Sequence, residues 1–258
     1  MHKSFFAFLF FSFLMAQSCK EVKAPDVPEK PKSKYSLTAF ENSQSFPNAS
    51  INDMNFKDGT FSFDVKEYEL GNQTSDADSK MCANSAKGQH IHLIVDKEPY
   101  AAKYTATFDY DVDDAKEYIL AFLSRSYHES IKTKEAHLAK KVTIKNNSIE
   151  SQEDIESPML FYSRPKGTYV GDSNTKKVML DFYLVNTDLS EDGNYVDANI
   201  NGEIHKITKW QPYYIEGLPM GDNYVSLVLR DKSGKQMDIP LNPVKRVFTL
   251  KEDPTPQG

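Results

Sequence analysis

Short segments in which apolar residues alternate with polar ones recur along this chain, and they constrain its fold more than any other feature. In residues 89–95 the alternation puts His90 and His92 together on one face of a strand, opposite the apolar face. Residues 118–123 are apolar on both faces, as in a central strand. Turn-forming Gly, Asn and Asp residues separate such segments. The pattern predicts an all-β protein built from sandwiches.

The second half of the chain repeats the order of features in the first half. Tyr118-Ile119 aligns with Tyr224-Val225, and Val142 in a last strand aligns with Phe248. The first half is longer, and the polar stretch 71–88 is the natural place for the extra residues. Two tandem β-sandwich domains are therefore expected. The predicted segments are domain one at 50–146, an acidic linker at 147–157 and domain two at 158–252.

Residues 1–19 have the features of a bacterial lipoprotein signal peptide. Lys3 provides a positive start, and the apolar run 5–16 is shorter than the roughly 20 residues of a transmembrane helix. Ala16-Gln17-Ser18-Cys19 then matches a lipobox, which predicts covalent lipid, including an acyl chain such as palmitate, on Cys19. The alternatives are an ordinary signal peptide cleaved near Cys19 and an uncleaved anchor. Residues 20–49 are predicted to be a flexible tether, because prolines and alternating charges dominate their first half.

The signal and the composition limit the location and the partners. Lys20 stands where an Asp would favour retention in the inner membrane, so we expect a lipid-anchored outer-membrane protein, on the periplasmic side or the cell surface. The net charge of −6 makes nucleic acid a poor partner, because neutralisation of phosphates dominates that kind of affinity. The expected partners are the membrane, through the anchor, and a protein of the outer membrane.

His90 and His92 are the sharpest candidates for chemistry. Two imidazoles side by side on a strand suit Zn²⁺ or Cu²⁺, with His128, Cys82 or Met81 as the third ligand. Release of the metal is expected below about pH 6, as imidazoles with an ordinary pKa of about 6.5 become protonated. The alternative is that the two rings are polar groups on the solvent face of the sheet, or pack against domain two.

Other candidates are less specific. Arg125 and Lys132 suit a phosphate or sulfate, unless they are ordinary loop residues, with Arg125 paired to an acid. Tyr213 and Tyr169 suit a partner surface, or else they belong to a core. No nucleophile elbow or ordered Ser, His and Asp motif is present, so no enzymatic activity is predicted.

Several segments together resemble a known group of proteins. GQHIHLIVDKEPY (88–100) and AFLSRSYHES (121–130) resemble exported flavobacterial-type lipoproteins of the Bacteroidota, sometimes labelled phosphopeptide-binding. LFYSRPKG, LDFYLVNTDLS and KWQPYYIEGLP in the second half resemble the same group, and the resemblance extends over most of residues 55–250. It implies an exported protein with tandem Ig-like domains.

These observations lead to two expectations for function. The first is a non-catalytic outer-membrane lipoprotein that binds or scaffolds other subunits of a membrane assembly. The alternative is a periplasmic or surface lipoprotein that binds zinc or copper through the strand with His90 and His92.

Overall fold

The computed structural model describes residues 33–254, so the predicted signal peptide, Cys19 and the first part of the predicted tether lie outside the described residues. The described part is almost entirely β, with one short helix, α1 (Asp172–Thr175), and two 3-10 turns, η1 (Ala77–Ser79) and η2 (Lys134–Ala136). The strands are β1 (Ser36–Ala39), β2 (Ser50–Lys57), β3 (Thr60–Lys66), β4 (His90–Val95), β5 (Ala101–Lys103), β6 (Thr107–Asp109), β7 (Tyr118–Ser124), β8 (His137–Lys145), β9 (Ser148–Asp154), β10 (Met159–Arg164), β11 (Gly167–Val170), β12 (Lys177–Val185), β13 (Tyr195–Ile200), β14 (Glu203–Ile207), β15 (Tyr213–Glu216), β16 (Gly221–Arg230) and β17 (Val244–Lys251). None of the helices between residues 33 and 254 is long and apolar enough to span a bilayer.

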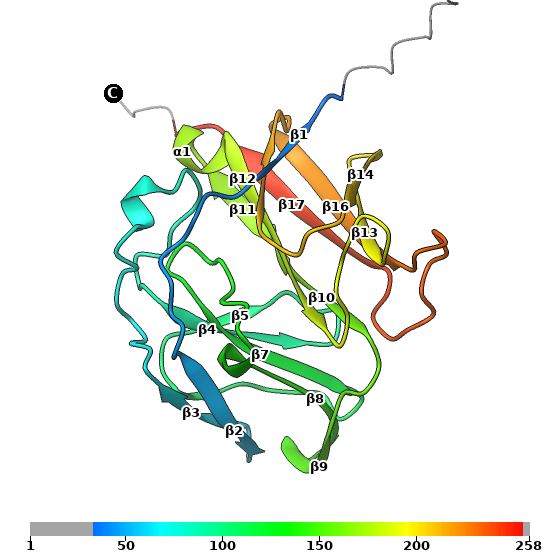
Figure 1. Ribbon diagram of the computed structural model, residues 1–258. Coiled ribbons are helices and arrows are strands. Elements are labelled where there is room, and N and C mark those ends of the chain that lie inside the picture. Colours follow the sequence, from blue (N-terminus) through cyan, green and yellow to red (C-terminus); the bar gives the residue numbers. More distant parts are fainter. Residues whose placement is uncertain (1–32, 255–258) are drawn as a thin grey trace, which may run out of the picture. The chain divides into compact units, whose positions relative to one another are not determined.

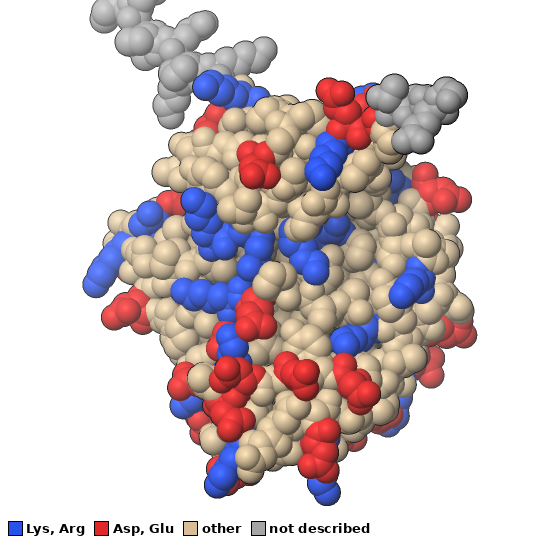
Figure 2. Space-filling model, turned by 180° about the vertical axis from the view of Figure 1, so that it is seen from behind, with Lys and Arg blue, Asp and Glu red and all other residues tan. Residues whose placement is uncertain are grey.

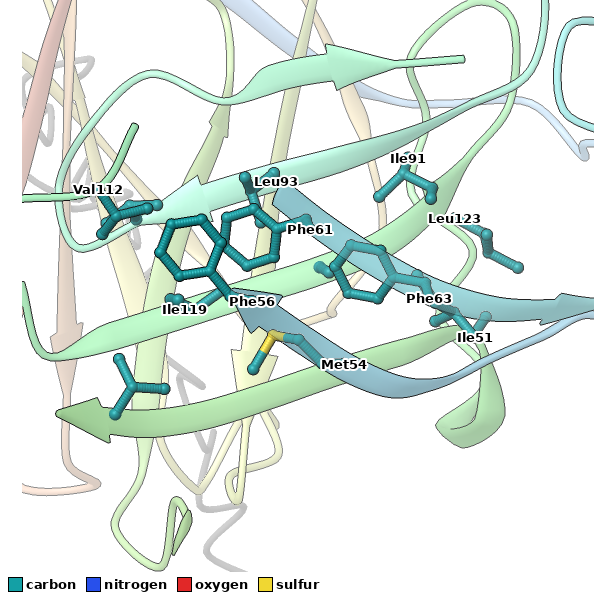
Figure 3. Packing of buried hydrophobic residues seen from close by; sticks show 14 of the residues in the cluster. Ile51, Met54, Phe56, Phe61, Phe63, Ile91, Leu93, Val112, Ile119 and Leu123 are labelled. Atoms are coloured by element: carbon teal, nitrogen blue, oxygen red, sulfur yellow. The ribbon is translucent and has the colours of Figure 1, made fainter. Parts of the chain in front are cut away.

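The first sandwich packs a three-stranded sheet, β2-β3-β6, against a five-stranded sheet, β5-β4-β7-β8-β9. Its core fills the space between the two sheets. Figure 3 shows Phe56, Phe61 and Phe63 of the small sheet next to Leu93 and Ile119 of the large one. These inward positions alternate with outward ones, as the sequence pattern predicts.

The second sandwich packs the sheet β1-β15-β12-β10 against the sheet β11-β17-β16-β13-β14. Strands β2, β3 and β6 of the first sandwich correspond to β10, β12 and β15 here, and β5-β4-β7-β8 correspond to β14-β13-β16-β17. Both therefore have the A-B-E and C′-C-F-G sheets of Ig-like sandwiches. The predicted fold class, tandem Ig-like sandwiches, is confirmed (Figure 1).

The repeat places equivalent residues at equivalent positions. Val142 on β8 and Phe248 on β17, aligned in the sequence, are buried in the cores of their respective sandwiches. The polar stretch 71–88 connects β3 to β4, whereas the shorter stretch 186–194 connects β12 to β13. The extra length of the first half is thus a loop inserted at the place that the sequence predicts.

Two of the predicted segment boundaries are wrong. Most of the predicted acidic linker is strand β9, which pairs with β8 from Lys140↔Asp154 to Lys145↔Ser148. As an edge strand with mostly exposed side chains, β9 has no apolar face to reveal it in the sequence. The second half of the predicted tether contains β1, which pairs with β15 from Ser36↔Glu216 to Ala39↔Tyr213.

A third hydrophobic core lies between the two sandwiches. Ile94, Leu120 and Phe122, on the outer face of β4 and β7, pack with Phe161 and Tyr183 of β10 and β12. All five are at most 1% exposed. A five-stranded sheet of one sandwich is thus stacked on a four-stranded sheet of the other, and the chain from Ser33 onward is one compact unit. The outer face of β4, with its two histidines, is therefore buried.

Charged side chains of both signs cover the surface. Figure 2 shows Lys and Arg gathered across the middle of one face, with Asp and Glu mostly below them. Several surface pairs, such as Lys141–Glu153 at 3.2 Å, have exposed partners. Such pairs contribute little to stability because water screens them, so the three cores carry most of the folding free energy.

Candidate metal centre

His90 and His92 project from β4 into the interface between the sandwiches. Both side chains are completely buried. Opposite them on the neighbouring strands are Ser124 and Phe122 of β7 and Ala102 of β5. The period of two along the strand puts both rings on the outer face, as predicted, and the second sandwich then covers that face.

His128 reaches the same place from the turn that follows β7. Its backbone is left-handed, with φ of +70°, a conformation that histidine adopts more readily than most residues with a side chain. Its N–H donates to the carbonyl of Arg125 at 2.8 Å, and Ser124 forms an isolated bridge with Ser130. The turn therefore folds back on itself and directs the His128 ring toward β4.

Arg125 and Lys132 hold this turn in place and do not offer free cations for an anion. The Arg125 guanidinium lies 3.5 Å from Glu129 and donates to the carbonyl of Gln44 at 2.6 Å. Lys132 forms a 2.6 Å ion pair with Asp181 of β12, which also accepts the N–H of Ser130 at 2.9 Å. Both predicted anion ligands are thus paired with internal carboxylates. The ion pair between Lys132 and Asp181 connects the turn to the second sandwich.

The inserted loop 71–88 fixes the orientation of His90. The carbonyl of Gly88 lies 2.8 Å from Nδ1 of His90, and a carbonyl only accepts, so Nδ1 carries the proton and Nε2 presents a lone pair. Gly88 has φ of +83°, and a Cβ there would lie 2.5 Å from the carbonyl oxygen of Asn72. Only glycine allows this close approach.

Three ring nitrogens converge on one point. Nε2 of His90 is 2.8 Å from Nε2 of His92 and 3.0 Å from Nδ1 of His128, and the third side of the triangle is 3.4 Å. The circle through the three atoms has a radius of about 1.8 Å, so an ion about 2.0–2.1 Å from each would lie roughly 1 Å out of their plane. The three histidines would hold such an ion with three ligands, and a tetrahedral ion could take one further ligand.

Burial keeps the three imidazoles neutral. It lowers the pKa of His90 to about 4 and holds the pKa values of His92 and His128 well below their usual range, because a charged ring is poorly solvated there. The nearby charge of Arg164 acts in the same direction on all three pKa values. Neutral rings offer their lone pairs to a metal at pH 7. The expectation that the metal is released below about pH 6 assumed imidazoles with an ordinary pKa. Because burial lowers their pKa values, the rings become protonated only at lower pH.

Residues without an assigned role in the sequence analysis surround the triad. The Tyr100 ring stacks on His92 at 3.6 Å, and its hydroxyl lies 3.3 Å from Nδ1 of His128. Ser163 of β10 places Oγ 3.3 Å from Nδ1 of His92, where it can fix the tautomer of that ring. Ser163 belongs to the other sandwich, so nothing in the local sequence points to this contact.

Cys82 and Met81, the alternative third ligands, do not join the cluster. The group of described side chains able to hold a metal consists of the three histidines. Met81 is 58% exposed, and Cys82 is a buried free thiol that packs with Tyr127 and Tyr214.

Cys82 is expected to be inert to alkylation in the folded protein. Burial raises the pKa of its thiol to about 11, so only about one thiol in a thousand is ionised at pH 8. Mass spectrometry of the peptide containing Cys82 should show iodoacetamide labelling at least about 100-fold faster in denaturant than in buffer. Equal rates in the two conditions would show that the thiol is exposed.

The two tyrosines predicted for a partner surface have other roles. Tyr169 is buried in the core of the second sandwich, and its hydroxyl accepts from Arg164 at 2.9 Å. Its assignment to a surface is therefore wrong. Tyr213 is half-buried and packs against the same core, while its hydroxyl donates to the carbonyl of Lys209 at 2.9 Å.

Comparison with known proteins adds little to this geometry. The sequence matches no family model and no curated protein. Among solved structures, the chain is similar to the fibronectin(III)-like modules of CbhA from Clostridium thermocellum, with 15% identity and a TM-score of 0.29. That similarity covers 37% of this chain and 100% of the other chain.

Proposed function

We propose that this protein binds a zinc or copper ion between its two sandwiches and acts as a metal-binding lipoprotein of the outer membrane. The observation that supports the proposal most strongly is the convergence of three imidazole nitrogens within 3.4 Å of one another. Two of the rings are completely buried, and a histidine that is buried only for packing does not need two others at hydrogen-bonding distance.

The chemistry of the ligand set favours these two metals. Three neutral nitrogen ligands without thiolate or carboxylate suit Zn²⁺ and copper rather than Mg²⁺ or Ca²⁺, which prefer oxygen. The bond between Nδ1 of His90 and the Gly88 carbonyl is the outer contact that ligating histidines usually make. Three protein ligands with an open side are typical of sites that exchange a ligand, whereas structural zinc sites have four.

The role in the cell envelope rests on the sequence. A lipid on Cys19 would keep the metal site at the membrane, and Cys19 precedes the described residues. A scaffolding role in an outer-membrane assembly is compatible with metal binding and stays a second proposal. We place metal binding first because the three ring nitrogens of His90, His92 and His128 support it.

Elemental analysis of reconstituted protein tests the proposal. Metal-free protein, incubated with Zn²⁺ or Cu²⁺ and desalted, should retain about one equivalent of at least one of them. His92→Ala should retain less than about 0.2 equivalents, because it removes one of three ligands. His205→Ala, on β14 and outside the triad, is the matched control and should bind like the wild type. Equal retention by the His92 variant, or none by the wild type, would reject the site.

A further inference from the structure

Three positive side chains lie near one another, and two of them, Arg164 and Lys166, are beside the histidine triad. They are Arg164 of β10, Lys166 just after it and Arg246 of β17, and the charges of the two arginines lower the pKa of Lys166. Among residues 33–254, none of the three forms an ion pair with a carboxylate. Lys166 and Arg246 are partly exposed, whereas Arg164 is buried, and a buried cation without an internal counter-charge is unusual.

Arg164 is the most unusual of the three. It is only 4% exposed, and the hydroxyl of Tyr169 accepts from its Nε at 3.3 Å and its Nη2 at 2.9 Å. Within the described part of the chain, Tyr169 is the one hydrogen-bond partner of this guanidinium, and Nη1 is buried without a partner. Burial of this guanidinium lowers the stability of the fold unless an anion lies next to it, because its positive charge has no counter-charge and one of its nitrogens has no acceptor.

The nearby thiol of Cys82 does not supply that anion. Burial raises the pKa of Cys82 to about 11, so this thiol is neutral at pH 7. The positive charge of Arg164 is therefore uncompensated by the described residues around it.

Short contacts connect these cations to the metal centre. The β10 strand has a bulge between Tyr162 and Arg164, and Ser163 within it contacts His92. Lys166 donates to the carbonyl of Tyr100 at 2.7 Å, and its Nζ lies 4.0 Å from the centre of the Tyr100 ring, which itself stacks on His92. Arg164 and Lys166 are thus linked to the triad through Ser163 and Tyr100.

A bare divalent ion at the triad would be repelled by Arg164 and Lys166, whereas an anion would be attracted by the metal and by both cations. We propose that the site takes its metal together with a small inorganic anion, which occupies the open side of the ion and is held by Arg164 and Lys166. This inference rests on the proposed metal function. The ligand class is a small anion such as a halide, pseudohalide or oxyanion, and guanidinium and ammonium groups are its usual partners in proteins.

Azide binding to the copper-loaded protein tests the inference. Copper content is measured first, and azide is then titrated while the azide-to-Cu²⁺ charge-transfer absorption, which requires a direct bond, is followed. The wild type should give a saturable band. Arg164→Gln and Lys166→Gln should bind copper in the same amount and azide about tenfold or more weakly, because each loses a charge-assisted contact. Lys166 is only partly buried, so its variant serves if the Arg164 variant fails to fold.

Lys141→Gln, which removes the same charge from an exposed site on β8, is the matched control and should bind azide like the wild type. If copper binds but azide gives no band, or gives the same affinity in all variants, the anion site is wrong and the metal function stands. If the wild type retains neither copper nor zinc, the metal function fails and the anion site fails with it. If it retains zinc alone, the anion site on copper is wrong and the metal function stands.

Discussion

Replacement of Asp181 by alanine is expected to destabilise the protein by about 3–5 kcal/mol, as is usual when one partner of a buried ion pair is removed. Asp181 is completely buried and accepts from both Lys132 and the Ser130 N–H. Without it, a mostly buried ammonium and a backbone donor lose their acceptor. Urea unfolding of the metal-free protein measures the change in the free energy of unfolding.

The same substitution should also weaken metal binding, by about 10–100-fold, because Asp181 holds the turn that carries His128. Asp197→Ala is the matched control, since Asp197 pairs with Arg230 at the far sheet of the second sandwich and has no contact with that turn. It should leave the metal affinity unchanged. A loss of stability below about 1 kcal/mol in Asp181→Ala would show that the carboxylate does not secure the turn.

Acidification should destabilise the metal-free protein between about pH 6.5 and pH 4. The pKa of His90 is about 4 in the folded chain and near its ordinary value of 6.5 in the unfolded chain, so the unfolded state binds more protons in this window. The stabilisation is therefore complete above pH 6.5 and is lost as the pH falls toward 4. For His90 alone the loss is about 3 kcal/mol, and His92 and His128, with lowered pKa values, change stability in the same direction.

Chelator-treated protein, unfolded in urea at a series of pH values, tests this dependence. Carboxylates also titrate at the lower end, so the quantity of interest is the difference between the wild type and His90→Gln, which cannot titrate. Identical slopes for wild type and His90→Gln would mean that His90 does not change its protonation on unfolding in this range.

The parts of the centre that follow from local periodicity were predictable. The strand period of two placed His90 and His92 on one face, and the few residues between β7 and His128 kept the third ring within reach of them. The tandem sandwiches followed from alternation and turn signals. These features depend on neighbours along the chain, which a sequence displays directly.

The remaining features depend on how the two sandwiches meet. Ser163 and Arg164 come near the triad only because the sheet of β10 is stacked over the sheet of β4, and such stacking has no period in the sequence. Arg125 was proposed as an anion ligand and Tyr169 as part of a partner surface, because their internal partners, Glu129 and Arg164, are identified only in the folded chain. Strand β9 was predicted as a linker because most of its side chains are exposed, so its sequence has no alternation of apolar and polar residues.

The pairing of β1 with β15 has a consequence for the order of folding. The side chains of Thr38 and Glu216, which are hydrogen-bonded across this pair, are 178 residues apart in the sequence. The first described strand therefore has no partner until β15, near the end of the chain, has emerged from synthesis or export. Contacts between such distant residues form slowly, because a long loop must close first. We expect β1 to dock among the last strands, after the second sandwich has formed the sheet edge that receives it.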